Sequence, residues 1–426
     1  MADYVEVCSY LMGSSKTNSI INWMSENNQD KYIYVVPNLN ELQDTEDANS
    51  RVLSIGFKTP EVSDIFKTKS EHLYHLCSIG ESVACTHVLY KMLNESTLKL
   101  IKDKGYILVI DEEVALIDTY TSASPADLVS LLNDKKVTIS DTDGMVTWIA
   151  NDEITDAYTK TEHKYNKFYK HIKNENIYTT RQITTNDKYS SLFMVSQITK
   201  DVIDCAKRVI IITYLYKDSI LDCFLRLKGF KVKRFTDVLI KEVSLEDVVS
   251  RVTLLPYDEK LSKLKLSSSW WNTATGADVK VVENYIRRVS RKSGLSSGEI
   301  MWTLPSSRTK WGQGKKKIKV APQSYVEGSD GEPCWIACTM KATNRYSHKK
   351  LAIHCFNRYP HVAVYSYLND YGYKIDQEKF AVSELLQWLF RSNIRTVGGQ
   401  VTVAIASKRM YNLYLKWANG EINDDF

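Results

Sequence analysis

Several features that would assign this chain to a special class are missing from its 426 residues. No apolar run approaches the roughly 20 residues that a membrane-spanning helix needs, so we expect no membrane partner. The opening segment MADYVEV has no basic region followed by an apolar one, so we also expect no secretory signal. None of the 8 cysteines forms a C-x-x-C pair. We therefore expect reduced, half-buried thiols rather than disulfides or zinc ligands.

A strong net charge is also missing. The chain has 56 basic and 51 acidic residues and a net charge of +5, so nucleic-acid binding must be argued from local clusters. Its 43% hydrophobic and 25% charged residues are typical of folded globular proteins. A chain of this length is expected to form two or three domains.

Short apolar runs alternate with stretches of helical spacing along most of the chain, which favours parallel sheets with crossover helices. The alternation restarts after residue 216, and residues 255–330 are polar and rich in glycine and serine. We therefore predict an α/β fold of two domains, residues 1–216 and 217–426, with an insertion in the second at about 255–330. After it we expect further alternation, beginning with PCWIACTM and KKLAIHCF and including a helix over 380–395.

The stretch CSYLMGSSKTNSII is similar to a phosphate-binding loop, G-x-x-x-x-G-K-[ST]. Lys16 and Thr17 are in place, but Tyr10 and Ser15 occupy the glycine positions, and Gly13 is the only glycine. A strand is predicted before the stretch and a helix after it, which is the context that the motif requires. Free N–H groups of the helix would bind phosphate, the lysine would reach the β- and γ-phosphates and the threonine would contact magnesium. A glycine-serine turn before lysine also occurs by chance.

Two acids end one of the most apolar runs. In YILVIDEE, Asp111 and Glu112 follow the run directly, and the carboxyl edge of a parallel sheet is where ligands bind. One acid there can hold a magnesium ion and a second can orient the attacking water. The alternative is that both are ordinary turn residues.

A polar set recurs in SELLQWLFRSNIR at spacings of three and four, which places it on one face of a helix. Its members are Glu384, Gln387, Arg391 and Arg395. Such a face can be a plain solvated surface. It can also present an arginine pair to a nucleotide and stabilise charge on the transferred phosphoryl group.

The segment RTKWGQGKKKIK is the best local candidate for nucleic-acid contact, because cations neutralise phosphates and an aromatic ring can stack on a base. The alternative is a solvated loop whose lysines only aid solubility. The residues assigned to this contact are Arg308, Lys310, Trp311, Lys315, Lys316 and Lys317. The pair Trp270 and Trp271 is interpreted as packing residues.

Taken in order, these segments resemble superfamily 2 helicases, and more specifically the DEAD/DEAH-box helicase-like proteins of phages of Gram-positive bacteria. LMGSSKT is similar to the P-M-G-S-G-K-T start of that superfamily. The other matching segments are YIYVVPNLNEL, CTHVLY, YILVIDEEVALID, IIITYLY, CTMKATNRY, FNRY and SELLQWLFRSNIR...SKRM, in order from residue 8 to about 417. Residues 120–200 and 255–310 match poorly.

The resemblance implies two RecA-like domains, ATP hydrolysis with Mg²⁺ in the cleft between them, and nucleic acid bound across both. We expect this nucleic acid to be DNA more than RNA, although the sequence itself does not distinguish them. The resemblance assigns Gly13, Ser14, Ser15, Lys16 and Thr17 to the phosphate loop, Thr17 and Asp111 to the metal, Glu112, Gln387, Arg391 and Arg395 to catalysis, and Thr213 and Tyr214 to coupling between hydrolysis and nucleic acid. The chain departs from the family at Ser15, where glycine is usual, and in the spacing of the two arginines. Few residues precede the loop, so base recognition is expected from elsewhere.

The predicted function is therefore an ATP-dependent DNA helicase or translocase in phage replication or recombination, acting in the host cytoplasm with replication or recombination proteins. An alternative is an ATP-gated nucleic-acid-binding factor, for origin recognition or loading, that does not unwind. A third possibility is an ATPase that acts on proteins only, which the basic segment disfavours. If Ser15 needs a positive φ, it carries strain of roughly 1–2 kcal/mol. The intact pairs Lys16–Thr17 and Asp111–Glu112 nevertheless favour a working site.

Overall fold

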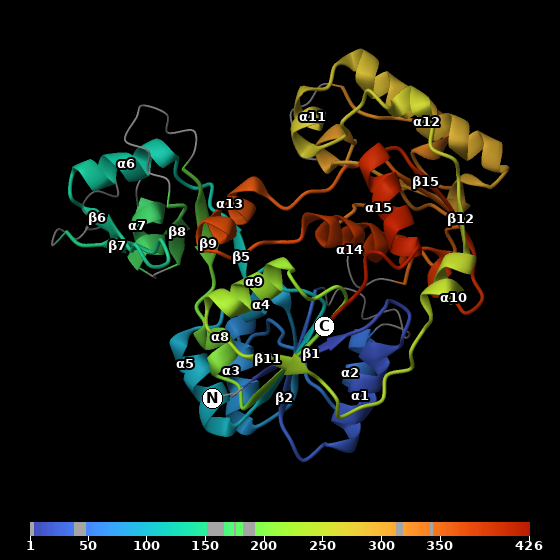
Figure 1. The fold of residues 1–426 in the computed structure, drawn as a ribbon. Helices are drawn as coiled ribbons and strands as arrows, with labels where there is room; N and C mark the ends of the chain where they lie inside the picture. Colours follow the sequence, from blue (N-terminus) through green and yellow to red (C-terminus); the bar gives the residue numbers. More distant parts are fainter. Residues whose placement is uncertain are drawn as a thin grey trace.

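The computed structural model of the chain describes residues 4–37, 48–150, 166–173, 176–181, 192–311, 318–340 and 344–426. Two parallel β-sheets form the centres of two domains, and a smaller lobe projects from the first (Figure 1). The predicted α/β class with two parallel sheets is confirmed. Within the described ranges, no helix is long and apolar enough to cross a membrane.

The first domain is built on a six-stranded parallel sheet with strand order β11-β1-β10-β4-β2-β3. Its strands are β1 (Val5–Ser9), β2 (Tyr32–Val36), β3 (Val83–Thr86), β4 (Ile107–Asp111), β10 (Arg208–Thr213) and β11 (Val232–Arg234). Its helices are α1 (Lys16–Glu26), α2 (Ala48–Ser54), α3 (Lys69–Ile79), α4 (His87–Lys91), α5 (Glu95–Lys104), α8 (Asp201–Asp204) and α9 (Ile220–Leu227). Because β1, β10 and β4 are neighbours, their carboxyl ends lie side by side.

The central strands are buried on both faces of this sheet. In β10, Val209 and Ile211 belong to one hydrophobic core, and Ile210 and Ile212 belong to the core on the opposite face. Side chains alternate between the two faces of a strand, so a strand buried on both faces reads as a continuous apolar run. This explains why these strands are easily recognised in the sequence.

The first domain extends beyond the predicted boundary at residue 216. β11 pairs in parallel with β1, with Val232 opposite Val5, and Phe224 of α9 packs into the core of the first sheet. The helix, glycine and strand predicted after residue 216 do form, but they complete the first domain. The boundary therefore lies between Arg234 and the start of the next domain at Leu245.

The second domain is built on a four-stranded parallel sheet with strand order β12-β15-β14-β13. Its strands are β12 (Val252–Leu254), β13 (Ile300–Thr303), β14 (Leu351–His354) and β15 (Val401–Ile405). Its helices are α10 (Leu245–Ser250), α11 (Ser268–Thr273), α12 (Gly276–Ser293), α14 (Gln377–Leu389) and α15 (Lys408–Ala418). The two faces of this sheet are again covered by separate hydrophobic cores.

Residues 255–330 contribute to this core, so the predicted insertion is wrong. β13 is the edge strand of the sheet, and Val282 and Ile286 of α12 belong to the same hydrophobic core as its Trp302. Of the polar stretches that suggested an insertion, the serines of SSSWW begin α11, and SGLSSGE leads from the end of α12 into a 3₁₀ turn, Ser297–Glu299. PCWIACTM, where the alternation was expected to resume, forms no strand and takes part only in isolated bridges, from Trp335 to Trp302 and from Pro333 to Glu327.

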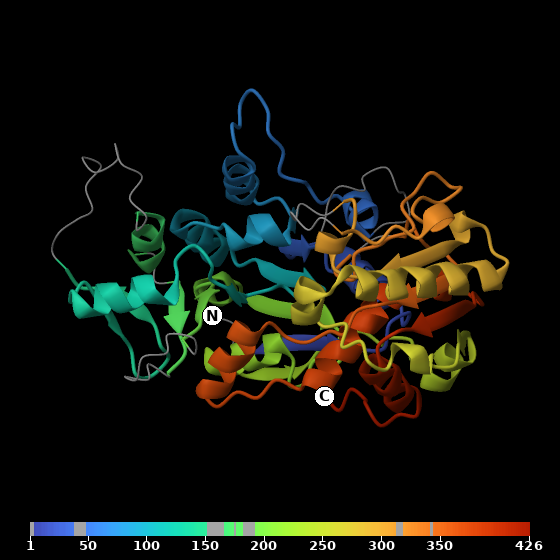
Figure 2. The ribbon, with the colours of Figure 1, turned by 90° about the horizontal axis from the view of Figure 1, so that it is seen from above.

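An insertion is present in the first domain instead, between β4 and β10. It forms the projecting lobe, which contains the antiparallel sheet β5-β9-β8 and the hairpin β6-β7. Its elements are β5 (Ile117–Thr119), α6 (Pro125–Asn133), β6 (Val137–Ile139), β7 (Val146–Trp148), α7 (Asn166–Lys173), β8 (Ile177–Thr179) and β9 (Met194–Gln197). Seen from above, the lobe lies at one end of the molecule and α12 lies at the other (Figure 2).

Two sets of contacts join the second half of the chain to the first domain and its lobe. Helix α13 (Val362–Asp370) comes from the second half of the chain but packs on the lobe, where the Tyr367 hydroxyl donates to the carbonyl of Asp143 at 2.6 Å. After α15, Asp425 pairs with Lys217 of the first domain at 2.9 Å and with Lys379 of the second at 2.6 Å. The two domains are thus held together at several separate places.

Candidate functional site

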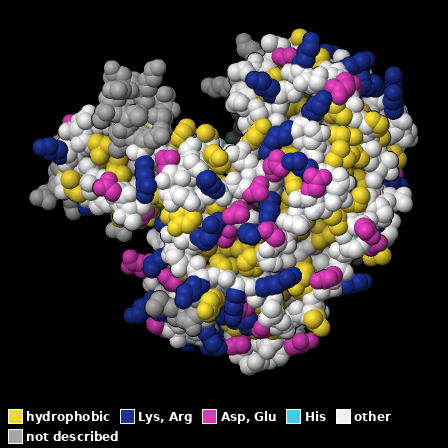
Figure 3. Space-filling model, in the orientation of Figure 1, with side chains coloured by type: hydrophobic (Ala, Val, Ile, Leu, Met, Phe, Trp, Pro, Cys, Tyr) yellow, Lys and Arg dark blue, Asp and Glu magenta, His cyan; other side chains and the backbone are white. Residues whose placement is uncertain are grey.

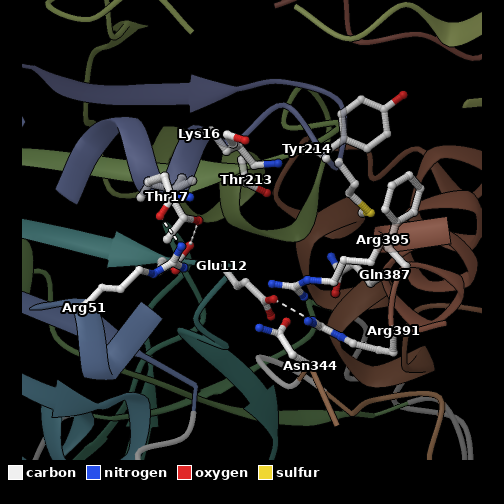
Figure 4. A pocket seen from close by; sticks show the side chains of 17 residues that line it. Lys16, Thr17, Arg51, Glu112, Thr213, Tyr214, Asn344, Gln387, Arg391 and Arg395 are labelled. Carbon is white, nitrogen blue, oxygen red and sulfur yellow. Dashed lines mark hydrogen bonds and ion pairs between the residues drawn. The ribbon is translucent and has the colours of Figure 1, made fainter. Parts of the chain in front are cut away.

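A cavity of about 580 Å³ lies where the carboxyl ends of β1, β4 and β10 meet the second domain (Figure 4). Segments that are far apart in the sequence line it, and they include the phosphate-loop, acidic and arginine segments that sequence analysis singled out. The predicted residues in its wall are Gly13, Ser15, Lys16, Thr17, Asp111, Glu112, Thr213, Tyr214, Gln387, Arg391 and Arg395. Ser14 is buried beside them in the same loop.

The loop before α1 has a left-handed backbone at two positions. Gly13 has φ +87° and Ser15 has φ 57° and ψ 20°. The Ser15 side chain makes no capping hydrogen bond, and the first turn of α1 contains no acidic residue. The helix therefore starts with amide groups that its own side chains do not cap. Such amides and the positive end of the helix dipole favour an anion.

The Lys16 ammonium points back into this loop. Its Nζ donates to the carbonyl of Tyr10 at 3.0 Å. Burial lowers the pKa of Lys16, whereas the nearby Asp111 and Glu112 carboxylates act in the opposite direction. An ammonium group has three donors, so the lysine can keep this bond and still reach an anion in the cavity.

The Asp111 carboxylate is fixed by two hydroxyl groups. Its Oδ1 accepts from Thr17 Oγ1 at 3.2 Å and its Oδ2 accepts from the Tyr34 hydroxyl at 2.8 Å. Burial raises the pKa of Asp111, as does the Glu112 charge, while the two hydroxyl bonds act in the opposite direction. A carboxylate and a hydroxyl at this separation are hard oxygen donors of the kind that Mg²⁺ prefers.

Glu112 connects the two domains. Its backbone is left-handed, with φ 62°, and its N–H donates to the carbonyl of Ile212 at 3.0 Å. Its Oε1 accepts from Arg391 Nη2 at 2.7 Å. Arg391 is only 4% exposed and is shielded from water, whereas the Glu112 side chain is 24% exposed. A left-handed residue other than glycine costs on the order of 1 kcal/mol and is frequent at functional sites.

The arginines do not lie on the predicted helical stripe. α14 ends at Leu389, Arg391 follows that end, and Arg395 is the last residue of a separate 3₁₀ turn, Asn393–Arg395. Gln387 is still on α14, where its Nε2 donates to Ser383 Oγ at 3.2 Å. Both arginines nevertheless line the cavity, since the chain folds back over it after the helix.

Thr213 and Tyr214 connect the loop before α1 to the second domain. The Thr213 carbonyl accepts from the N–H of Tyr10 at 3.3 Å, and the Tyr214 hydroxyl accepts from Trp417 Nε1 at 3.0 Å. The Ser9 hydroxyl, at the end of β1, donates to Asp424. The assignment of Thr213 and Tyr214 to coupling between hydrolysis and nucleic acid stays a prediction.

The assignment of Arg308 to nucleic-acid contact is wrong. Its side chain is only 3% exposed, and its guanidinium donates to the carbonyls of Trp271 at 2.8 Å and Ala274 at 3.0 Å. A buried guanidinium with these partners stabilises α11 and its connection to α12. Trp271 is also buried, in agreement with its interpretation as a packing residue.

The rest of the basic segment is partly engaged. Trp311 stacks on Trp335 with ring centroids 5.6 Å apart, and Lys310 pairs with Glu327. Lys315, Lys316 and Lys317 lie outside the described residues. On the face drawn in Figure 3, Lys and Arg side chains are interspersed with Asp and Glu rather than gathered into one patch.

Sequence analysis missed several residues in the cavity wall. Arg51 on α2 and Asn344 bring further polar groups, and Met12 and Phe390 bring apolar surface together with Tyr214, whose hydrophobic core they share. Arg51 lies outside every motif considered, and only folding brings it beside α1. Phe390 could have been noticed between Gln387 and the arginines, but its apolar character indicated only packing.

The fold and the cavity together define an α/β protein of two parallel-sheet domains with a loop similar to a phosphate-binding loop at their junction. A family model described as the YonV C-terminal Rossmann-like domain matches residues 246–418, which contain the second sheet. The chain is 26% identical to the SPbeta prophage-derived uncharacterized protein YonV of Bacillus subtilis (strain 168), over 98% of this chain and 99% of that protein. A solved structure of S. tokodaii Xpd4 covers 97% of this chain and 94% of its own, with a TM-score of 0.45 and 10% identity.

Proposed function

We propose that this chain is a nucleoside triphosphatase that binds ATP and Mg²⁺ in the cavity between its two domains. The proposal depends on one observation: two acids and a lysine of the first domain meet two arginines of the second in a single cavity. Phosphoryl transfer requires basic groups that hold the phosphates and acids that hold the metal and orient the water. Its catalysis depends mainly on positioning these groups and on stabilising the charge of the transferred phosphate.

Each group has a distinct part in this proposal. The amides at the start of α1 and the Lys16 ammonium hold the phosphates, and Thr17 and Asp111 are the residues that fit the metal. Bound Mg²⁺ would neutralise phosphate charge and polarise the bond to be broken. Glu112 accepts the proton of the attacking water. In the structure its carboxylate pairs with Arg391, so a terminal phosphate would compete for that arginine and release the carboxylate.

The cycle is proposed to act on nucleic acid, DNA rather than RNA, as a helicase or translocase. The order of the matching segments along the chain supports this part, together with the position of the cavity between the two domains. A second candidate is an ATP-gated nucleic-acid-binding factor without unwinding activity. The pre-formed Arg391–Glu112 pair and the strained Ser15 favour slow turnover, which suits such a factor.

The test is ATP hydrolysis with and without single-stranded DNA, repeated with RNA. Lys16→Ala should lower turnover by on the order of 100-fold, whereas Lys99→Ala, which removes an exposed lysine of α5, should not change it. A strand-displacement assay then separates the two candidates. Turnover that survives in the Lys16→Ala variant would contradict the proposed site.

A further inference from the structure

The cavity contains an arginine to which the proposed mechanism gives no part. Arg51 projects from α2, and its Nη1 donates to Asn18 Oδ1 in the first turn of α1. Its Nε atom is buried and has no hydrogen-bond partner within the described residues. The guanidinium is therefore held beside the start of α1 with a donor still to be satisfied (Figure 4).

Cations outnumber acids around this part of the cavity. Lys16, Arg51, Arg391 and Arg395 face Asp111 and Glu112. Burial lowers the pKa of the Arg395 guanidinium, and the charges of Arg391 and Arg51 lower it further. Like charges brought together in a shielded space repel each other unless an anion lies between them. The arrangement therefore suits an anion that carries several negative charges.

The two ends of the cavity differ in character. Tyr214 lies at one end, and Met12 and Phe390 belong to the same hydrophobic core. Arg51 lies at the other end, on the side of Thr17 and the Asp111 carboxylate bonded to it, and Glu112 lies between the two ends with its carboxylate toward Arg391 (Figure 4). A nucleotide held by the start of α1 would direct its terminal phosphate to the end where the acids act. Arg51 is thus on the side of the terminal phosphate and away from the apolar end.

We propose that Arg51 binds the terminal phosphate of a nucleoside triphosphate from the first-domain side, opposite Arg391 and Arg395. This inference depends on the proposed function. The three arginines would then enclose the terminal phosphate from both domains, and Arg51 would make the site prefer a triphosphate to a diphosphate. Because Arg51 belongs to the same domain as the phosphate loop, its contact does not require the two domains to close. Asn18 is a positioning residue that orients the guanidinium through the hydrogen bond to Nη1.

The test measures the dissociation constants of ADP and of a slowly hydrolysed ATP analogue for the full chain. Arg51→Ala should weaken binding of the ATP analogue by roughly 10- to 100-fold, the worth of a hydrogen bond to a charged group. Binding of ADP should change little, so the preference for the triphosphate falls. Arg51→Lys should recover part of the lost affinity for the ATP analogue. Asn18→Ala should also weaken binding of the analogue, but by less than Arg51→Ala.

Two controls separate the inference from the function on which it depends. Arg226→Ala removes an arginine of α9 that is outside the cavity wall and should leave both constants unchanged. Thermal unfolding of Arg51→Ala and Arg51→Lys checks that each variant is folded. If the wild type binds the analogue and hydrolyses ATP while Arg51→Ala and Arg51→Lys keep its preference for the triphosphate, Arg51 has no such role. If the wild type binds neither nucleotide, the proposed function itself fails.

Discussion

Replacing Ser15 by glycine tests the strain in the loop before α1. Ser15 has φ 57° and an exposed side chain that makes no capping hydrogen bond. The left-handed conformation costs a residue with a Cβ atom roughly 1–2 kcal/mol. Glycine removes that strain but loses more conformational freedom on folding, by roughly 0.5–1 kcal/mol. The net expectation for Ser15→Gly is a gain in unfolding free energy of about 0.5–1 kcal/mol.

A gain of this size corresponds to a rise in Tm of about 1–4 °C for a domain of this size. Turnover of ATP should be equal to that of the wild type or faster, because the amides around the phosphates are no longer strained. Thermal unfolding and steady-state hydrolysis measure the two quantities. Ser14→Gly is a matched control, since Ser14 does not have a positive φ and glycine there relieves nothing, so that variant should be less stable than the wild type.

The opposite result has a defined meaning. If the Ser15 hydroxyl donates to a phosphate oxygen, Ser15→Gly should weaken ATP binding by about 1 kcal/mol, the typical worth of one hydrogen bond. We favour relief of strain, because Lys16 and the Thr17 hydroxyl already supply the charge and the hydroxyl that the site needs. A variant with an unchanged or lower Tm would refute the strain argument, and complete loss of hydrolysis would refute the view that this loop is a tolerated variant of an ordinary phosphate loop.

Three further predictions follow from other parts of the chain. Glu112→Gln should still bind ATP but hydrolyse it slowly, because an amide cannot deprotonate water; normal turnover would mean that the acid only ends a strand. Replacing the lysines of residues 315–317 by alanine should weaken nucleic-acid binding. It should also lower the slope of log binding constant against log salt concentration by about one unit per lost phosphate contact, and an unchanged slope would mean that these lysines make no phosphate contacts. Asp330→Asn should lower stability by about 2–3 kcal/mol, because it leaves the buried ammonium of Lys349 without its carboxylate. Partial burial acts to raise the pKa of Asp330, but its hydrogen bonds with Lys349 and His348 outweigh burial and lower this pKa to about 2. The contribution is therefore present above pH 4, roughly the ordinary pKa, and is lost as the pH falls toward 2, so denaturant unfolding of wild type and variant should converge there.

The strands of the first sheet could be predicted because they are buried on both faces. In β4 no polar residue interrupts the run from Ile107 to Ile110, and Asp111 and Glu112, which come directly after it, mark the carboxyl edge of the sheet. The domain boundary could not be predicted in the same way. The order of strands in a sheet depends on contacts between distant segments, so nothing local shows that β11 returns to pair with β1 rather than starting the second sheet.

The candidate site was predictable where its residues are close together in sequence. Lys16 and Thr17 are recognisable because a helix must start at the loop, and Asp111 and Glu112 because they end a strand. Arg308 shows the limit of such reasoning. A basic residue between serine and threonine suggests an exposed loop, but its guanidinium satisfies buried backbone carbonyls that come from a different segment.

The contacts between the domains limit how the proposed cycle can move them. The Arg391–Glu112 pair lies in the cavity, Asp425 joins Lys217 to the second domain outside it, and α13 packs into the lobe through Tyr367, which is fully buried. A phosphate that draws Arg391 away from Glu112 breaks only the first of these contacts. The contacts of Asp425 and of α13 lie outside the cavity and would remain. The proposed cycle can therefore exchange the partner of Arg391 without separating the two sheets.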